Sequence, residues 1–295
     1  MTWSAELRRF HLGLRTVLGS GRHGYFIPSR SAQYRAYNDA EPYYRPAADI
    51  FKLREPTMRD WLAVVDGYAE ALMAIEPGPE SHRPQKPQGN KRARARWRQD
   101  WFPRLDAALL YGFIRHFKPR QIVEVGSGHS TRFAQQAIED EGLSTCLTAI
   151  DPHPRKALSA GNRFTWVAEP VQRASLSIAR KLGSGDILLI DSSHVLMPGS
   201  DVDLLLNRVI PELATGVIVQ FHDVFLPDNY PPNWRWRGYN EQLGIAALLT
   251  RSSQEILMSS HYVTTRMAAE FERTQISKLP ILPGASENSL WLKIC

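Results

Sequence analysis

The sequence predicts a doubly wound α/β fold, in which helices cover both faces of a mostly parallel sheet. Three observations lead to this prediction. A glycine-rich turn in residues 121–131 (QIVEVGSGHST) joins a short apolar strand to a helix. A second apolar strand ends in an acidic residue about 20 residues beyond that turn. Residues 186–190 (DILLI) then form a continuous apolar run, typical of a strand buried on both faces of a parallel sheet.

The glycine-rich turn has the features of a ligand-binding loop. Gly126 and Gly128 let the chain bend and bring a ligand close to bare backbone, and the helix that begins near Ser130 offers free N–H groups. Thr131 stands where the third glycine of a dinucleotide-binding G-x-G-x-x-G belongs, and Glu124 stands where a pyrophosphate would be repelled. A carboxylate beside such a turn favours a ligand with a cationic or zwitterionic head, such as S-adenosylmethionine (SAM).

The next strand, residues 145–150, stops at Asp151, which is placed to bind the hydroxyls of a ribose. The segments EVGSGHST and AIDPH together resemble motifs I and II of class I SAM-dependent methyltransferases. The alternative is a Rossmann-like domain for another nucleotide. The resemblance implies SAM as the cofactor, and the residues that it places there are Glu124, Gly126, Ser127, Gly128, Ser130, Asp151 and Asp191.

The remaining elements follow in the order of such a sheet. After Asp151 we expect a helix, a third strand at 164–168, the buried strand at 186–190, a helix, a fifth strand at 216–221, a helix at 241–249 and strands at 255–258 and 289–294. The prediction is therefore a Rossmann-like, doubly wound sheet of seven strands. The resemblance implies that the last strand is antiparallel.

Polar side chains come directly after two of these strands. Asp191 and His194 follow the fourth strand, and His222 and Asp223 follow the fifth. Because ligands bind beyond the carboxyl ends of such strands, we expect these side chains beside the SAM loop. The pattern IDSSH, then FHDVFLPDNYP, then NEQ resembles a bacterial methyltransferase family related to macrocin-type O-methyltransferases and cephalosporin hydroxylase-like proteins. That resemblance covers residues 100–295.

The family resemblance implies a divalent metal near the methyl group of SAM. Asp191 and Asp223 match two ligands of a magnesium site, but His222 stands at the third position, where relatives have a carboxylate. Because imidazole suits Zn, Fe or Mn better than Mg, two versions stay open. Either a metal (Mg, Mn, Zn or Fe) is held by Asp191, His222 and Asp223, or no metal binds and His222 is the general base. His194 and Asp191 are the other catalytic candidates, and each histidine can instead be structural.

The acceptor of the methyl group is expected next to the loop at 226–239. Its aromatic residues Trp234, Trp236 and Tyr239 suit a lid over a flat or sugar-like ligand. Glu241 and Gln242 match the E-Q that follows this loop in the resembled family, which implies that they contact the acceptor. The alternative is that the aromatic residues only tether a long loop.

The chain divides by composition into a helical and irregular N-terminal extension (1–80), a basic linker (81–98) and the methyltransferase domain (99–295). Hydrophobic spacing predicts helices at 3–18, 57–75 and 105–117, while 24–48 has an irregular, tyrosine- and proline-rich sequence. The linker contains seven basic residues and no acidic one, and it leads into a helix expected from Trp97. A solvated linker is favoured over a phosphate-binding patch, because interleaved aromatic residues are missing.

Composition and motifs together predict a cytoplasmic enzyme. Two cysteines, no signal-like N-terminus and no apolar run long enough for a bilayer favour a reducing compartment and no membrane span. The leading function is SAM-dependent methylation of a small-molecule acceptor at oxygen, in bacterial specialised metabolism. The alternatives are a SAM-fold protein that binds or methylates nucleic acid through 83–98, and a cephalosporin hydroxylase-like enzyme of another class. The extended N-terminal helices would suit a homodimer.

Overall fold

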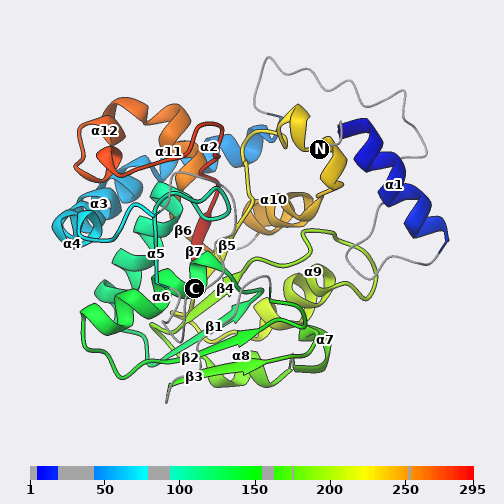
Figure 1. Ribbon diagram of the computed structural model, residues 1–295, viewed down its shortest axis with the longest axis horizontal. Coiled ribbons are helices and arrows are strands. Elements are labelled where there is room, and N and C mark those ends of the chain that lie inside the picture. Colours follow the sequence, from blue (N-terminus) through cyan, green and yellow to red (C-terminus); the bar gives the residue numbers. More distant parts are fainter. Residues whose placement is uncertain (1–4, 19–42, 79–93, 155–162, 175, 252–253) are drawn as a thin grey trace.

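The computed structural model describes residues 5–18, 43–78, 94–154, 163–174, 176–251 and 254–295. Its centre is a seven-stranded sheet in the order β3-β2-β1-β4-β5-β7-β6, with β7 antiparallel to both of its neighbours (Figure 1). The strands are β1 Gln121–Val125, β2 Cys146–Ile150, β3 Phe164–Val167, β4 Ile187–Ile190, β5 Ile218–Phe221, β6 Glu255–Ser259 and β7 Leu290–Lys293. Each predicted strand is present, and the predicted fold class is confirmed.

The register of the parallel strands places the functional edge of the sheet. Val125 at the end of β1 pairs with Ile150 of β2 and Ile190 of β4, and Ile190 pairs with Phe221 of β5. Every residue of β4 and β5 is buried, because helices flank the sheet. The residues that follow these strand ends therefore emerge together at one edge.

Helices pack around the sheet, and most of those that the structure describes follow the order that the sequence predicts. α5 (Arg104–Phe117) packs against α6 (His129–Asp140), and α8 (Leu176–Lys181) packs against the π-helix η2 (Leu205–Val209) and the 3-10 helix η3 (Ile210–Glu212). The other described helices are α1 Ala5–Val17, α2 Arg45–Leu53, α3 Glu55–Asp66, α4 Ala69–Met73, α7 Val171–Ala174, α9 Asp201–Leu204, η4 Pro232–Arg237, α10 Glu241–Arg251, α11 Ser260–Arg266, α12 Ala268–Glu272 and η5 Ile276–Lys278. Of the predicted helices, 3–18 and 241–249 correspond to α1 and α10. None of the helices in the described ranges is both long and apolar enough to cross a membrane.

The single helix predicted over 57–75 is wrong, because α3 ends at Asp66 and α4 begins at Ala69. Gly67 caps the end of α3, and glycine loses more conformational freedom in a helix than any other residue. Tyr68 leaves the helix and lies under the guanidinium of Arg115, with 4.7 Å between Cζ and the ring centroid. The hydrophobic stripe that predicted one helix is therefore shared by two.

The helix predicted from Trp97 is also wrong. Residues 94–103 are irregular, and α5 begins at Arg104. Trp97 is buried and its Nε1 donates to the Leu72 carbonyl at 3.1 Å, while the Gln99 Oε1 accepts from the backbone N–H groups of Trp101 and Phe102 at 3.0 and 2.8 Å. The Gln99 side chain thus accepts the backbone hydrogen bonds that carbonyl groups would accept in a helix.

Several other expectations fall on parts of the chain that the structure leaves undescribed. These are most of the basic linker (79–93), most of the aromatic N-terminal stretch (19–42) and the helix expected after Asp151 (155–162). The division into extension, linker and domain stays a prediction. Within the described residues, α1 lies against η4 at the side of the sheet that carries α10 (Figure 1).

Candidate functional site

A cavity of about 790 Å³ opens at the carboxyl edge of β1, β2, β4 and β5. Its walls combine residues that follow these strands with residues from the loops before α5 and β7 and from η4. The sequence-predicted site residues in the walls are Gly126, Ser127, Asp151, Asp191, His194, His222, Asp223, Trp234 and Tyr239. The remaining predicted residues do not line the cavity: Glu124, Gly128, Ser130, Trp236, Glu241 and Gln242.

Gly126 is required where the turn after β1 meets the end of β4. Its φ is +88°, a conformation that favours glycine, and a Cβ added to it would lie 2.0 Å from the backbone oxygen of Asp191. The Asp191 N–H in turn donates to the Val125 carbonyl at 2.9 Å. Gly128 differs, because a Cβ there would meet nothing within 4 Å. Gly126 therefore allows the glycine turn to pack closely against the end of β4.

Glu124 holds the glycine turn from behind. It is fully buried and accepts hydrogen bonds from Ser130 Oγ at 2.5 Å and Thr131 Oγ1 at 2.6 Å. Thr131 Oγ1 itself accepts from the Gly128 N–H at 2.9 Å. Burial raises the pKa of Glu124 to about 7, although the two hydroxyls oppose this shift. Glu124 and Ser130 therefore shape the loop and the start of α6, and their predicted role at the cofactor would act through that shape.

The raised pKa of Glu124 predicts how stability depends on pH. A carboxyl group whose pKa is raised on folding stabilises the native state when protonated, so this contribution is lost as the pH rises from 4.5 through 7. Glu124→Gln removes the ionisation, so the free energy of unfolding of the variant, relative to wild type, should rise by about 2 to 3 kcal/mol between pH 5 and pH 8. Urea unfolding of both proteins over this range measures the change. A difference that stays constant with pH would contradict the assignment.

Asp151 offers its carboxylate to the cavity from the end of β2. Its Oδ2 accepts from Ser127 Oγ at 2.5 Å, and its Oδ1 accepts from the His153 N–H at 2.8 Å. The Ser127 hydroxyl and the Asp151 carboxylate therefore lie side by side in one wall. A carboxylate held in this way, beside a bare glycine turn, fits the ribose of SAM.

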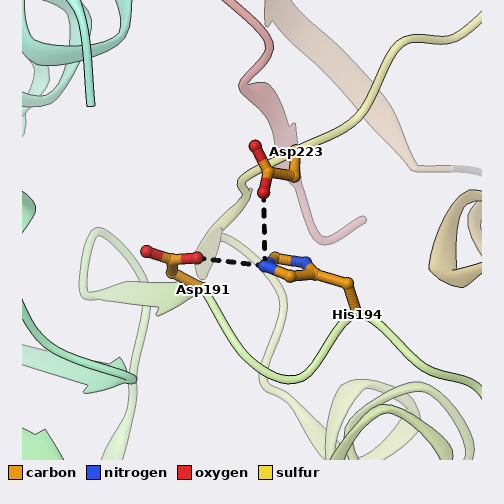
Figure 2. Close-up of side chains that lie close together, drawn as sticks. All are labelled: Asp191, His194 and Asp223. Carbon is orange, nitrogen blue, oxygen red and sulfur yellow. Dashed lines mark hydrogen bonds and ion pairs between the residues drawn. The ribbon is translucent and has the colours of Figure 1, made fainter. Parts of the chain in front are cut away.

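His194 lies among three carboxylates. Its Nδ1 is 2.9 Å from Glu241 Oε2. Its Nε2 is 3.1 Å from Asp191 Oδ1 and 3.5 Å from Asp223 Oδ2 (Figure 2). Burial alone lowers the pKa of His194, but Tyr239 and these carboxylates outweigh it and hold the pKa well above its usual value. The loop after β4 reaches this position with His194 in a left-handed conformation, at a φ of 60°.

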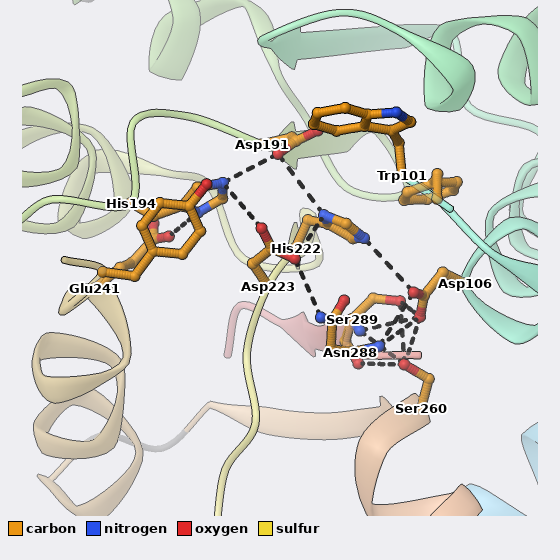
Figure 3. A network of polar contacts seen from close by, with 12 residues as sticks. Trp101, Asp106, Asp191, His194, His222, Asp223, Glu241, Ser260, Asn288 and Ser289 are labelled. Atoms are coloured by element: carbon orange, nitrogen blue, oxygen red, sulfur yellow. Dashed lines mark hydrogen bonds and ion pairs between the residues drawn. The ribbon is translucent and has the colours of Figure 1, made fainter. Parts of the chain in front are cut away.

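His222 lies on the other side of the same carboxylates. Its Nδ1 is 3.4 Å from Asp223 Oδ1 and 3.7 Å from Asp191 Oδ1, and its Nε2 is 3.5 Å from Asp106 Oδ2 (Figure 3). Both ring nitrogens are buried and neither has a hydrogen-bond partner among the described residues. Burial lowers the pKa of His222, but Asp223, Asp106 and Asp191 raise it well above its usual value.

Asp106 is a site residue that the sequence did not single out. It lies in the first turn of α5, is fully buried, and accepts from Ser260 Oγ at 2.5 Å, from the Asn288 and Ser289 N–H groups at 3.1 and 3.0 Å, and from Ser289 Oγ (Figure 3). It therefore joins α5 to the start of α11 and β7 and sets one side of His222. An aspartate in a first helical turn is ordinary in a sequence, so no local signal marks it.

Asp191, His194 and Asp223 lie close enough together to hold a metal ion. One ligand atom from each lies within 4.8 Å of the others. Glu241 binds the far nitrogen of His194, which is the arrangement that fixes the tautomer of a metal-binding histidine. Mixed carboxylate and imidazole donors fit Mn, Fe or Zn better than Mg. The sequence predicted His222 as the third metal ligand. In the structure, the three side chains whose ligand atoms lie close together are Asp191, His194 and Asp223, and His222 lies beside the two aspartates.

The residues that the sequence predicted to contact the acceptor divide between those that line the cavity and those that support it. Trp234 and Tyr239 line the cavity, as does Arg237, which the sequence did not single out. Gln242 instead supports the loop after β5, because its Oε1 accepts from the Phe225 N–H and its Nε2 donates to the Asp228 carbonyl, both at 3.0 Å. Glu241 supports His194.

Comparison with known proteins gives one family match. Residues 123–224 match the model of a family described as a methyltransferase domain. A curated relative, an uncharacterized protein of Archaeoglobus fulgidus, is 35% identical over an alignment of 88 residues that covers 28% of this chain. The match spans 39% of that relative's length.

Three solved structures are similar at low identity. An apo-structure of CmcI has a TM-score of 0.44 at 13% identity, covering 76% of this chain and 91% of that one. The SAH-bound methyltransferase PaMTH1 of Podospora anserina has a TM-score of 0.42 at 15% identity, covering 88% and 100%. The O-methyltransferase TomG of Streptomyces achromogenes, in complex with SAM, has a TM-score of 0.40 at 16% identity, covering 64% and 78%.

The family match runs from the middle of β1 to the residue after Asp223, so it includes the glycine turn, Asp151, Asp191 and both histidines. The sheet has the seven strands that the sequence predicted, with the last strand, β7, antiparallel as the resemblance implied. Residues 123–224 of this chain therefore match a methyltransferase domain, within a seven-stranded sheet of the predicted fold class.

Proposed function

We propose that this protein methylates a hydroxyl oxygen of a small molecule, with a divalent ion at Asp191, His194 and Asp223. One observation carries the proposal: a single cavity contains both the glycine turn with Asp151 and the cluster of carboxylates and imidazoles. The first group fits a cofactor, and the second fits an acceptor that must lose a proton. The small acceptor is supported by the size of this cavity, about 790 Å³, which must also hold the cofactor. A cytoplasmic location, a homodimer and a role in specialised metabolism stay predictions.

The cofactor half of the site binds and orients. Gly126 and Ser127 allow close approach of the ligand to the backbone, and Asp151 accepts hydrogen bonds from ribose hydroxyls. SAM, when bound, supplies a methyl group on a sulfonium, which is already a good leaving group. The protein therefore has to align the acceptor oxygen and remove its proton.

The acceptor half of the site carries an excess of negative charge. Asp106, Asp191, Asp223 and Glu241 surround His194 and His222, and Arg237 is the nearby arginine, with 3.9 Å between its Nη1 and Asp223 Oδ2. A divalent ion would lower the pKa of a bound hydroxyl, and its positive charge would offset the excess of negative charge. Asp191 and Asp223 would hold it with His194, and Glu241 would keep His194 oriented. The charge of the ion would offset the carboxylates that raise the pKa values of the two histidines, so that a neutral His194 could bind the ion and a neutral His222 could accept the proton. The metal-assisted version is therefore favoured over a lone histidine base.

The proposal is tested by isothermal titration of chelator-stripped protein with S-adenosylhomocysteine (SAH). Wild type is expected to bind in the micromolar range, and Asp151→Ala at least tenfold more weakly, because charge-assisted hydrogen bonds to the ribose are lost (about 1.5–3 kcal/mol). Asp60→Ala, an exposed aspartate on α3, is the matched control and should bind as wild type does. No binding of SAH by a folded wild-type protein would overturn the proposed function.

A further inference from the structure

Arg237 occupies the acceptor side of the cavity and is not used by the methyl-transfer chemistry. It ends η4 and is followed by Gly238, which turns the chain with a φ of 70° so that Tyr239 also faces the cavity. Its Nη1 lies 3.9 Å from Asp223 Oδ2. A positive charge is therefore held within one small molecule's length of the proposed reaction centre.

Aromatic rings hold this guanidinium in place. Its Cζ lies 3.9 Å from the ring centroid of Trp234, 5.3 Å from that of Trp236 and 5.4 Å from that of Tyr239. Nη1 donates to the Tyr239 hydroxyl at 3.2 Å. An arginine stacked in this way has already lost much of its side-chain freedom, so binding through its planar fork costs less.

The hydrogen-bonding capacity of Arg237 is not filled by its protein neighbours. Its Nε is buried and has no partner among the described residues. Asp223 does not provide one, because 3.9 Å is beyond hydrogen-bonding distance and its Oδ1 already accepts from Asn288 Nδ2 at 3.1 Å. A buried donor without a partner is costly, which points to a ligand that completes it.

We propose that Arg237 binds an oxyanion, by preference a carboxylate, on the molecule that is methylated. The inference rests on the proposed function, since it names the acceptor class of the same site. The guanidinium fork matches a carboxylate or phosphate in a bidentate manner. Trp234 and Tyr239, which also line the cavity, add aromatic surface beside the guanidinium, and such surface suits a flat group. The acceptor class is therefore a small, planar hydroxy acid whose hydroxyl lies a few bonds from its anionic group.

Matched probes test this in the SAH-loaded protein. Isothermal titration compares 3-hydroxybenzoate with 3-hydroxybenzamide, which has the same shape but no charge, and with phenyl phosphate. At least one of the two anions is expected to bind about tenfold or more tightly than the amide, as for a charged hydrogen-bonded pair. If phenyl phosphate binds best and its preference needs Arg237, the site is supported and the anion is a phosphate ester; if 3-hydroxybenzoate binds best, the anion is a carboxylate.

Variants of Arg237 distinguish binding at this site from a general attraction of anions to a basic protein. Arg237→Gln should remove the preference for the anion and leave the affinity for SAH unchanged, while Arg237→Lys, which keeps the charge but not the fork, should retain part of it. Arg59→Gln, an exposed arginine on α3, is the matched control and should keep the full preference. A preference for the anion that survives Arg237→Gln overturns the proposal. So does equal binding of 3-hydroxybenzoate, phenyl phosphate and 3-hydroxybenzamide, or no binding of any of these probes, by a wild-type protein that binds SAH. Loss of SAH binding by wild type would instead contradict the proposed function.

Discussion

Replacing Gly126 with alanine is expected to destabilise the domain by more than about 3 kcal/mol and to abolish SAH binding. The added Cβ would lie 2.0 Å from the backbone oxygen of Asp191, and the φ of +88° is strained for any residue with a side chain. Because Asp191 is bonded to β1 through its own N–H, relief of the clash must separate β1 from β4 at the site. Urea unfolding and SAH titration of the variant measure both effects.

Gly128→Ala is the matched control, two residues along the same turn. Its φ of 174° is extended backbone that any residue adopts, and the added Cβ would meet nothing within 4 Å. This variant should unfold within about 1 kcal/mol of wild type. Equal unfolding midpoints for the two alanine variants would show that the contact between the turn and the end of β4 does not constrain position 126.

Asp223→Asn is expected to weaken the binding of one divalent manganese ion by at least about 100-fold, since loss of even the groups that support metal ligands costs 10–100-fold. Asparagine is chosen because position 223 has a φ of 58°, which asparagine tolerates better than alanine. The measurement is isothermal titration of chelator-stripped, SAH-loaded protein with manganese. Asp228→Asn, outside the cavity and paired with Arg266 and His261, should bind manganese as wild type does.

The identity of the metal gives a second comparison at the same site. With an imidazole among the ligands, manganese or zinc should bind more tightly than magnesium. His194→Gln should reduce this difference in affinity between the metals. Magnesium binding more tightly than manganese in wild type would contradict nitrogen ligation by His194. Unchanged manganese affinity in Asp223→Asn would contradict the site itself.

Short-range patterns were sufficient to predict most of the fold. β4 is apolar throughout, and β5 is apolar apart from Gln220, because both faces of these strands are buried. A run of this kind is visible in four or five consecutive residues. The helix expected over 57–75 was wrong because hydrophobic spacing continues across Gly67 although the backbone does not. The helix expected at Trp97 was wrong because the Gln99 side chain bonds locally to the backbone.

The candidate site divides in the same way between sequence and structure. Because parallel strands end at one edge of the sheet, the sequence by itself determined that Gly126, Asp151, Asp191 and Asp223 would meet there. Only the tertiary structure decided the partners behind them: Glu241 on His194, Asp106 beside His222, and Arg237 stacked on Trp234. Asp106 and His222 are separated by more than a hundred residues along the chain. Such contacts depend on helix packing and side-chain direction, which local periodicity does not encode.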